Sequence, residues 1–237
     1  MEREFIASEP ELMDRPDASP AELDAALQSL RGLNRYFGGY RIVTRFMKRW
    51  IRRGERVRVR VLDLATGSAD IPRLVADHAR GLGAVVEIVA VDFQPATIEA
   101  ARRFSADYPE ISCECADVLT FEAAEPFDIV ICSLALHHFS QQDAVRLLRR
   151  ARALSRRHVL ISDLRRGWLL TVGVDLLTAL IFRDRMTFND GRMSARRAFS
   201  SKELCGLAKK AGWQNFGAER FRFGRQAIWL ERARRDG

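Results

Sequence analysis

One apolar segment, residues 61–70, ends on an acid and then breaks into small residues: VLDLATGSAD. Such an apolar run predicts a buried β-strand, and the small residues around Gly67 predict a tight turn. Residues 70–82 follow with the apolar spacing of an amphipathic helix. A strand, a turn and a helix in this order form the unit at which open α/β sheets hold nucleotide-like ligands.

The same unit recurs along the chain. Strands are predicted at residues 57–64, 85–92, 111–116, 127–133 and 157–163, and helices at residues 70–82, 95–106 and 140–155. This alternation is typical of a doubly wound sheet. A helix at 200–211 and a hairpin formed by 213–223 and 225–232 close the chain. We therefore expect an α/β, Rossmann-like doubly wound fold with a mainly parallel seven-stranded sheet and a C-terminal antiparallel hairpin.

Residues 1–56 are predicted to form an N-terminal arm and a helical lid. Several prolines mark residues 8–20 as extended, and Ser19 followed by proline predicts the start of a helix that runs to about residue 30. A second amphipathic helix is expected through residue 51. Between the two helices, Tyr36 and Phe37 stand beside a Gly-Gly pair. They either cover a cofactor or substrate or anchor the helices to the domain.

Residues 164–199 are an insertion in the domain predicted at 57–237. Residues 169–182 are mostly apolar but too short to span a bilayer, which favours a helix that caps a substrate pocket. The alternative is a homodimer face or a membrane-surface contact, because exposed apolar patches mark partners. Arginines flank this segment, among them Arg165 and Arg166, and they either bind an anionic group of the substrate or are solvated and paired with acids.

Composition narrows the partners and the compartment. The formal charge is +8, but the arginines are spread along the chain, so nucleic acid is not the expected partner. Cys113, Cys115, Cys132 and Cys205 lack metal-ligand spacing, and three of them fall in predicted buried strands, which predicts core thiols and no metal site. The N-terminal residues lack the apolar core of a signal peptide, and we expect a cytoplasmic protein.

Polar side chains follow the predicted strands where each strand ends. Because the carboxyl ends of parallel strands meet at one edge, Gly67, Asp92, Asp117, Ser133 and Asp163 should ring one rim of the sheet. An acid at the position of Asp92 is suited to accept both hydroxyls of a ribose, and the aromatic residue after it, Phe93, is suited to cover an adenine. The rim therefore predicts a site for an adenosine-containing ligand.

A dinucleotide is the alternative ligand for such a rim. Its pattern G-x-G-x-x-G is absent, because the turn has only Gly67, with Ala65 and Ala69 at neighbouring positions. A pyrophosphate needs close backbone approach at a helix N-terminus, whereas a methionine moiety is less demanding. The turn therefore favours a ligand without a pyrophosphate.

Taken in order, these motifs resemble those of the class I S-adenosylmethionine-dependent methyltransferases over roughly residues 57–232. The resemblance implies S-adenosyl-L-methionine as the cofactor. It places Asp63 near the methionine amino group or beneath the turn, and Asp117 either on the adenine amino group or as a turn cap. The other residues that it implies for the cofactor are Ala65, Gly67 and Ser68 along the methionine, Asp92 and Phe93 at the ribose and adenine, Val118 against the adenine ring, and Ser133 near the methionine end.

A Leu-His-His stretch follows the fourth predicted strand directly. Histidine suits a general base because its ordinary pKa lies near neutral pH, and we favour His138 over His137 for this role. The alternative is that the histidines fix the loop by hydrogen bonds. This stretch, the N-terminal helical lid and the apolar insertion resemble those of bacterial quinone- and polyketide-type methyltransferases. Residues 34–39 and 190–199 are similar to those of some such enzymes encoded beside type III polyketide synthases.

That resemblance implies a small-molecule acceptor, aromatic or anionic. O-methylation of a phenolic or polyketide-like acceptor is the leading hypothesis. C-methylation of a quinone-like ring comes next, then RNA or protein methylation, and then a non-catalytic module that binds S-adenosylmethionine. Because the acceptor is recognised by pocket shape, the motifs define the class of reaction rather than the substrate.

Overall fold

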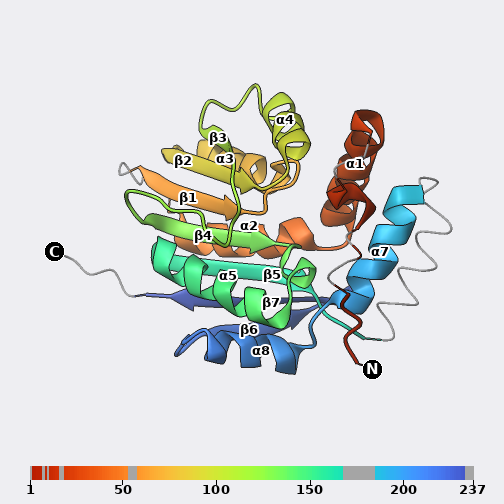
Figure 1. Ribbon diagram of the computed structural model, residues 1–237. Coiled ribbons are helices and arrows are strands. Elements are labelled where there is room, and N and C mark those ends of the chain that lie inside the picture. Colours follow the sequence, from red (N-terminus) through yellow and green to blue (C-terminus); the bar gives the residue numbers. More distant parts are fainter. Residues whose placement is uncertain are drawn as a thin grey trace.

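A central β-sheet organises the computed structural model, which describes residues 2–6, 9, 11–15, 19–52, 58–167 and 185–232 (Figure 1). The sheet has seven strands in the order β3-β2-β1-β4-β5-β7-β6. The strands are β1 (Val59–Leu64), β2 (Val86–Asp92), β3 (Ile111–Cys115), β4 (Phe127–Ser133), β5 (Ser155–Leu164), β6 (Gly217–Phe221) and β7 (Arg225–Glu231).

The first five strands are parallel to their neighbours. Strand β1 pairs with β2 on one side and with β4 on the other, β3 extends the sheet beyond β2, and β5 extends it beyond β4. Strand β7 lies antiparallel between β5 and β6. The predicted α/β doubly wound fold, with its mainly parallel seven-stranded sheet and C-terminal antiparallel hairpin, is confirmed.

The predicted helices within the described residues fall close to their positions, apart from the first, and the helix at Arg185–Arg197 lies where a loop was expected. The first helix continues to Tyr36 rather than ending near residue 30, because the apolar spacing of Leu23 and Leu27 continues through Leu30 and Leu33. The helices are α1 (Pro20–Tyr36), α2 (Gly39–Trp50), α3 (Asp70–Leu82), α4 (Pro95–Phe104), α5 (Gln141–Leu154), α7 (Arg185–Arg197) and α8 (Ser201–Lys210), with short 3-10 helices η1 (Leu12–Asp14) and η2 (Leu136–His138).

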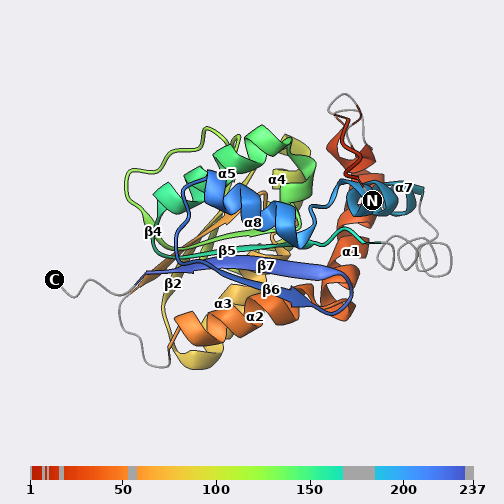
Figure 2. The same cartoon turned by 90° about the horizontal axis from the view of Figure 1, so that it is seen from below.

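Alternate side chains of the buried strands pack into two apolar cores, one on each face of the sheet. Val61 and Ile88 pack on the side covered by α2 and α3, whereas Leu62 and Val89 pack on the side covered by α5 and α8. Figure 2 shows these helix pairs on opposite sides of the sheet. With both faces covered, the parallel strands are apolar nearly throughout, which is why they read as continuous apolar runs in the sequence.

Helices α1 and α7 lie beyond the carboxyl ends of the parallel strands (Figures 1 and 2). The described residues of the N-terminal arm, 2–6, 9 and 11–15, are tied to α7. The backbone N–H groups of Leu12 and Met13 donate to the carboxylate of Asp190, at 2.7 and 3.0 Å. The segment predicted as an extended arm is thus fastened across the end of the sheet by a buried acid of the insertion.

Two expectations from the sequence need comment. Of the cysteines predicted in buried strands, only Cys132 is buried; Cys113 is partly exposed and Cys115 is exposed, because β3 is the edge strand of the sheet. The apolar helix predicted at 169–182 lies outside the described residues. Within the described ranges, no helix is long and apolar enough to cross a membrane.

The hairpin contains one glycine that has no space for a side chain. A Cβ atom on Gly217 would overlap the indole ring of Trp229, its partner across the β6–β7 ladder. We expect Gly217→Ala to lower the free energy of unfolding by about 1–3 kcal/mol, as overpacking usually does. Gly206→Ala is the matched control, because nothing lies within 4 Å of its added Cβ inside α8, and it should raise stability by up to about 1 kcal/mol. Equal stability of the two variants in urea denaturation would contradict this packing.

Candidate functional site

The turn after β1 has an unusual backbone. Ala65, Gly67 and Ala69 all lie in the left-handed region, with φ values of 55°, 56° and 54°. Glycine adopts this region freely, whereas alanine does so at a cost. The two alanines therefore occupy a conformation that favours glycine. Thr66 holds the turn, because its N–H donates to the carbonyl of Val91 at 2.9 Å.

Asp63 lies beneath this turn and not on the cavity that the turn borders. Its carboxylate accepts a hydrogen bond from the Thr66 hydroxyl at 2.6 Å, and the side chain is buried. Burial is the largest of the effects that together raise the pKa of Asp63 to about 8. The Thr66 hydrogen bond opposes it, and the nearby carboxylates of Asp70 and Asp92 add to it. Of the two roles predicted for Asp63, the geometry supports ordering of the turn.

Asp92 connects the two turns at the end of the sheet. One carboxylate oxygen accepts from the N–H of Gly67 at 2.9 Å, and the other accepts from the N–H of Gln94 at 3.3 Å. The side chain is nearly buried and borders the cavity, and Phe93 beside it is 57% exposed at the same cavity. The carboxylate is thus fixed in orientation at the rim, as a ribose contact requires.

The next two strand ends contribute to the same rim. Asp117 borders the cavity and also caps a turn, because its carboxylate accepts from the N–H of Leu119 at 2.8 Å. Val118 is buried. The hydroxyl oxygen of Ser133 is buried and has no hydrogen-bond partner within the described part of the chain. Such an orphaned group at a cavity is suited to bind a polar group of a ligand.

These groups line one cavity of about 1130 Å³. All residues predicted to contact the cofactor border it except Asp63. The arm, α1, α7, the loop at η2 and the β6–β7 turn supply the remaining walls, which are mainly apolar. These walls include Met13, Leu27, Leu30, Leu33, Phe37, Phe139 and Phe223. Because pockets for single small ligands usually enclose roughly 300–1,000 Å³, this cavity has room for a cofactor and a second molecule together.

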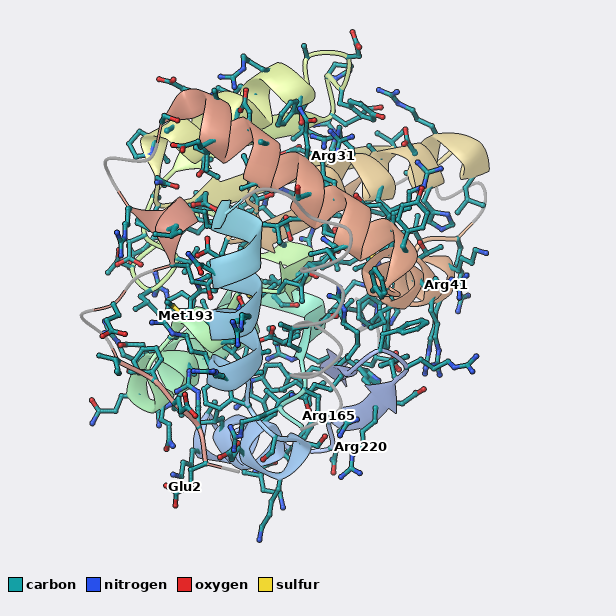
Figure 3. The ribbon with its side chains drawn as sticks, turned by 90° about the vertical axis from the view of Figure 1, so that its right-hand side faces the viewer. Glu2, Arg31, Arg41, Arg165, Met193 and Arg220 are labelled. Carbon is teal, nitrogen blue, oxygen red and sulfur yellow. The ribbon has the colours of Figure 1, made fainter. Side chains whose placement is uncertain are left out.

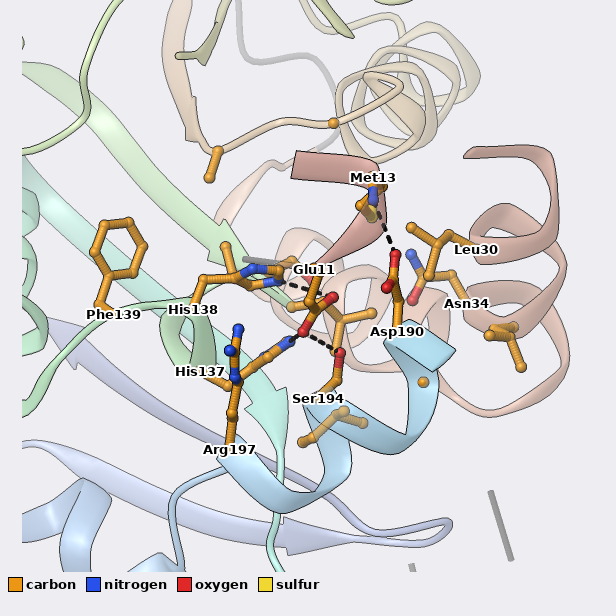
Figure 4. A pocket seen from close by; sticks show the side chains of 18 of the residues that line it. Glu11, Met13, Leu30, Asn34, His137, His138, Phe139, Asp190, Ser194 and Arg197 are labelled. Atoms are coloured by element: carbon orange, nitrogen blue, oxygen red, sulfur yellow. Dashed lines mark hydrogen bonds and ion pairs between the residues drawn. The ribbon is translucent and has the colours of Figure 1, made fainter. Parts of the chain in front are cut away.

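The paired histidines border the cavity from η2 (Figure 4). Nδ1 of His137 lies 2.6 Å from the carboxylate of Asp163, and the His137 side chain is only 3% exposed. His138 is 23% exposed, and the two ring centroids are 4.4 Å apart. Arg3 of the arm donates to the carbonyls of His137 and Phe139, at 2.9 and 2.7 Å. The histidine loop is thus held from both sides.

Glu11 is a residue of this site that the sequence did not indicate. Its carboxylate lies between the two imidazoles (Figure 4), 4.0 Å from Nε2 of His137 and 3.8 Å from Nε2 of His138. It also accepts a hydrogen bond from the hydroxyl of Ser194 in α7 at 2.7 Å. A glutamate within a proline-rich arm looks the same in the sequence whether its side chain is buried or solvated. The partners of Glu11 are also far away along the chain, so no local pattern indicates them.

The two aromatic residues predicted as a lid, Tyr36 and Phe37, differ in their position relative to the cavity. Tyr36 is 71% exposed and does not border the cavity. Phe37 borders it and packs edge to face on Phe223, with ring centroids 5.6 Å apart. The helix that carries both residues presents only one of them to the cavity, and Phe37 alone is a candidate substrate contact.

Of the polar residues predicted to contact the substrate, only some border the cavity. Arg165 borders the cavity and lies between α7 and β6 in Figure 3, where its backbone N–H donates to the carbonyl of Gly224. Arg166 lies outside the cavity, because its guanidinium donates to the carbonyl of Ala198 and to the carboxylate of Glu203 at 2.8 Å. Asp163 is buried beneath His137, and its structural role is to orient that imidazole.

The raised pKa of Asp63 has a consequence for stability. A carboxyl whose pKa is higher in the folded state than in the unfolded state stabilises the fold only at low pH, and this contribution is lost as the pH rises through the folded-state value. We expect Asp63→Asn to gain stability relative to wild type as the pH rises from about 4 to about 8, and the difference to stay constant above that. Urea denaturation across this range measures it. A difference that does not change with pH would show that Asp63 is ionised in the folded protein.

Comparisons with known proteins identify a domain in this chain and a shared fold. Residues 61–158 match the family described as methyltransferase domain. No curated protein sequence matches the chain. One similar solved structure is an O-methyltransferase family protein from Burkholderia thailandensis, with a TM-score of 0.69 and 17% identity over 94% of this chain and 63% of that chain. Another is human N-acetylserotonin methyltransferase in complex with S-adenosylmethionine, with a TM-score of 0.66 and 17% identity over 90% of this chain and 56% of that chain. A third is magnesium protoporphyrin IX methyltransferase from Synechocystis with bound S-adenosylhomocysteine, with a TM-score of 0.58 and 15% identity over 83% of this chain and 84% of that chain.

At these identities the solved structures establish a shared fold. The chain spans 56% of the length of the human protein and 63% of the length of the Burkholderia protein. The matched domain contains the Gly67 turn, Asp92 and the paired histidines, which border the same cavity. Residues 61–158 thus form a methyltransferase domain, and the chain shares its fold with solved S-adenosylmethionine-dependent methyltransferases.

Proposed function

We propose that this protein transfers a methyl group from S-adenosylmethionine to an oxygen atom of a small phenolic or polyketide-like acceptor. The observation that carries the proposal is a single cavity with two unlike sides. On one side are the turns and acids at the strand ends, and on the other are the paired histidines with Glu11 and apolar walls. A donor and an acceptor can therefore lie against each other in one enclosure.

The cofactor side fits an adenosine with a methionine tail. In this proposal the fixed carboxylate of Asp92 accepts hydrogen bonds from the two ribose hydroxyls, and Phe93 and Val118 lie beside the adenine. Ser133 offers an unpaired hydroxyl to the methionine end. Bound S-adenosylmethionine supplies an electrophilic methyl group on a positively charged sulfur. The protein has to align the acceptor with that methyl group and exclude water.

On the acceptor side, His138 is the residue placed to receive a proton. It is more exposed to the cavity than His137, which is engaged by Asp163. A phenol must lose its proton to attack a methyl carbon, and an imidazole at neutral pH is suited to take it. Glu11 lies 3.8 Å from Nε2 of His138 and would stabilise the imidazolium that forms.

The walls of the acceptor side support an aromatic acceptor with an anionic group. Phe37, Phe139 and Phe223 provide flat apolar surfaces. Arg165 and Arg225 border the same cavity, and burial lowers the pKa of Arg225 to about 10, so it remains charged at neutral pH. Guanidinium groups bind carboxylates and phenolates through paired hydrogen bonds. Because α1, α7 and the arm border this side, a small molecule is favoured over a polymer.

Cofactor binding tests the first half of the proposal. Calorimetric titration with S-adenosylhomocysteine should show one site in the wild type, weakened at least about tenfold in Asp92→Ala because hydrogen bonds to a charged group are lost. Asp107→Ala is the matched control, since Asp107 is exposed in the turn after α4 and does not border the cavity. Absence of binding to the folded wild type, or equal weakening in both variants, would contradict the assignment.

Methyl transfer tests the second half. Transfer of labelled methyl from S-adenosylmethionine is measured with a panel of phenols, resorcinols and hydroxyquinones as acceptors. With a substrate that the enzyme methylates, His138→Ala should lower kcat about 100-fold or more. It should also remove the increase of the rate with pH that an ionising base produces. The control variant His78→Ala, in α3 and outside the cavity, should leave kcat and its pH dependence unchanged. Methyl groups found on carbon in the product would favour C-methylation of a quinone-like ring instead.

A further inference from the structure

The Glu11 carboxylate and the two imidazoles bring three metal-ligating groups together. One oxygen of Glu11 and one ring nitrogen of each histidine lie within 4.8 Å of one another. Oε1 of Glu11 lies 4.0 Å from Nε2 of His137, and Oε2 lies 3.8 Å from Nε2 of His138. Around a tetrahedral zinc ion with bonds of about 2.0–2.2 Å, two ligand atoms lie roughly 3.3 Å apart. We propose that Glu11, His137 and His138 bind a divalent transition metal of the zinc class at the edge of the cavity.

The buried position of the Glu11 carboxylate favours a cation beside it. The side chain is only 2% exposed, and an ionised carboxylate removed from water is costly unless it is paired. Arg197 points toward the cluster in Figure 4, but its guanidinium donates to the backbone carbonyls of Ile6 and Glu9. An ion held between the three groups would supply the positive charge that this carboxylate lacks from Arg197.

Outer contacts hold two of the three ligands in the orientation that a metal needs. The carboxylate of Asp163 lies 2.6 Å from Nδ1 of His137, which places the ring proton on Nδ1 and the lone pair of Nε2 toward Glu11. Ser194 donates to the Glu11 carboxylate at 2.7 Å. Metal-binding histidines usually donate their second ring N–H to a carboxylate in this way, and ligating carboxylates are themselves hydrogen-bonded.

The ligand set indicates which kind of ion would bind. Two imidazole nitrogens and one carboxylate oxygen suit zinc and its neighbours, whereas magnesium prefers oxygen ligands alone. Three protein ligands leave a fourth position open, as in catalytic zinc sites. His138 and Glu11 both border the cavity, so this position faces the space assigned to the acceptor.

An ion in this position would change how the acceptor is activated. A hydroxyl oxygen bound to zinc loses its proton to water at a lower pH and keeps the electron pair that attacks the methyl carbon. The sulfur retains the electrons of the broken bond and leaves as the thioether. In the metal-free protein, His138 would instead accept the proton of the acceptor directly. Metal binding itself does not depend on the proposed methyl transfer.

The experiment uses the full chain after a chelator has removed bound metal. The protein is titrated with zinc, with binding measured by calorimetry, and separately with cobalt, with binding measured by visible absorption. We expect one ion per chain, with cobalt bands of nitrogen and oxygen ligation. Glu11→Gln and His138→Asn should each weaken binding at least about tenfold, and Asp163→Asn about 10- to 100-fold. His78→Asn is the matched control because it removes a histidine outside the cluster, and its affinity should equal that of the wild type.

Three results would overturn the metal site. They are no stoichiometric binding by the wild type, unchanged binding by both Glu11→Gln and His138→Asn, and cobalt bands of thiolate ligation alone, which would assign the ion to cysteines. Each variant is also titrated with S-adenosylhomocysteine. Retained nucleoside binding shows that the variant is folded, and it separates failure of the metal site from failure of the proposed methyltransferase function.

Discussion

Strand β1 pairs in parallel with β2 on one side and with β4 on the other, and the rest of the molecule depends on this arrangement. The chain winds toward β3 after β1 and then crosses to the opposite half of the sheet with β4. The connections that follow β1 and β4 therefore diverge and leave an opening at their carboxyl ends. The Gly67 turn and Asp92 border this opening from β1 and β2, and the paired histidines border it after β4.

The acceptor side is completed by segments that the sheet does not require. Glu11 comes from the N-terminal arm, Ser194 and Asp190 come from α7, and the histidines come from η2. A buried carboxylate is stable only when its partners are in place, so Glu11 couples the position of the arm to that of the histidine loop and α7. The wall of the cavity and the groups proposed to act on the acceptor are thus parts of one polar network.

The sheet could be predicted from the sequence because its signals are local. Apolar runs, small-residue turns and acids at strand ends are visible within a few residues of one another, and the common rim follows from parallel pairing. Pairings between distant segments leave no such signal. The contact between Glu11 and His138, the capture of Arg166 by Glu203 and the exposure of Tyr36 depend on tertiary packing. The edge position of β3, which exposes Cys115, likewise depends on strand order rather than on composition.

A crystal structure of the protein with S-adenosylhomocysteine tests the central claim most directly. The account predicts the ribose hydroxyls on the carboxylate of Asp92, the adenine between Phe93 and Val118, and the sulfur directed toward His138. The space between the sulfur and the Glu11 cluster should remain open for an acceptor. A nucleoside bound in the reverse direction, with its adenine against the histidines, or bound outside the cavity would contradict the account.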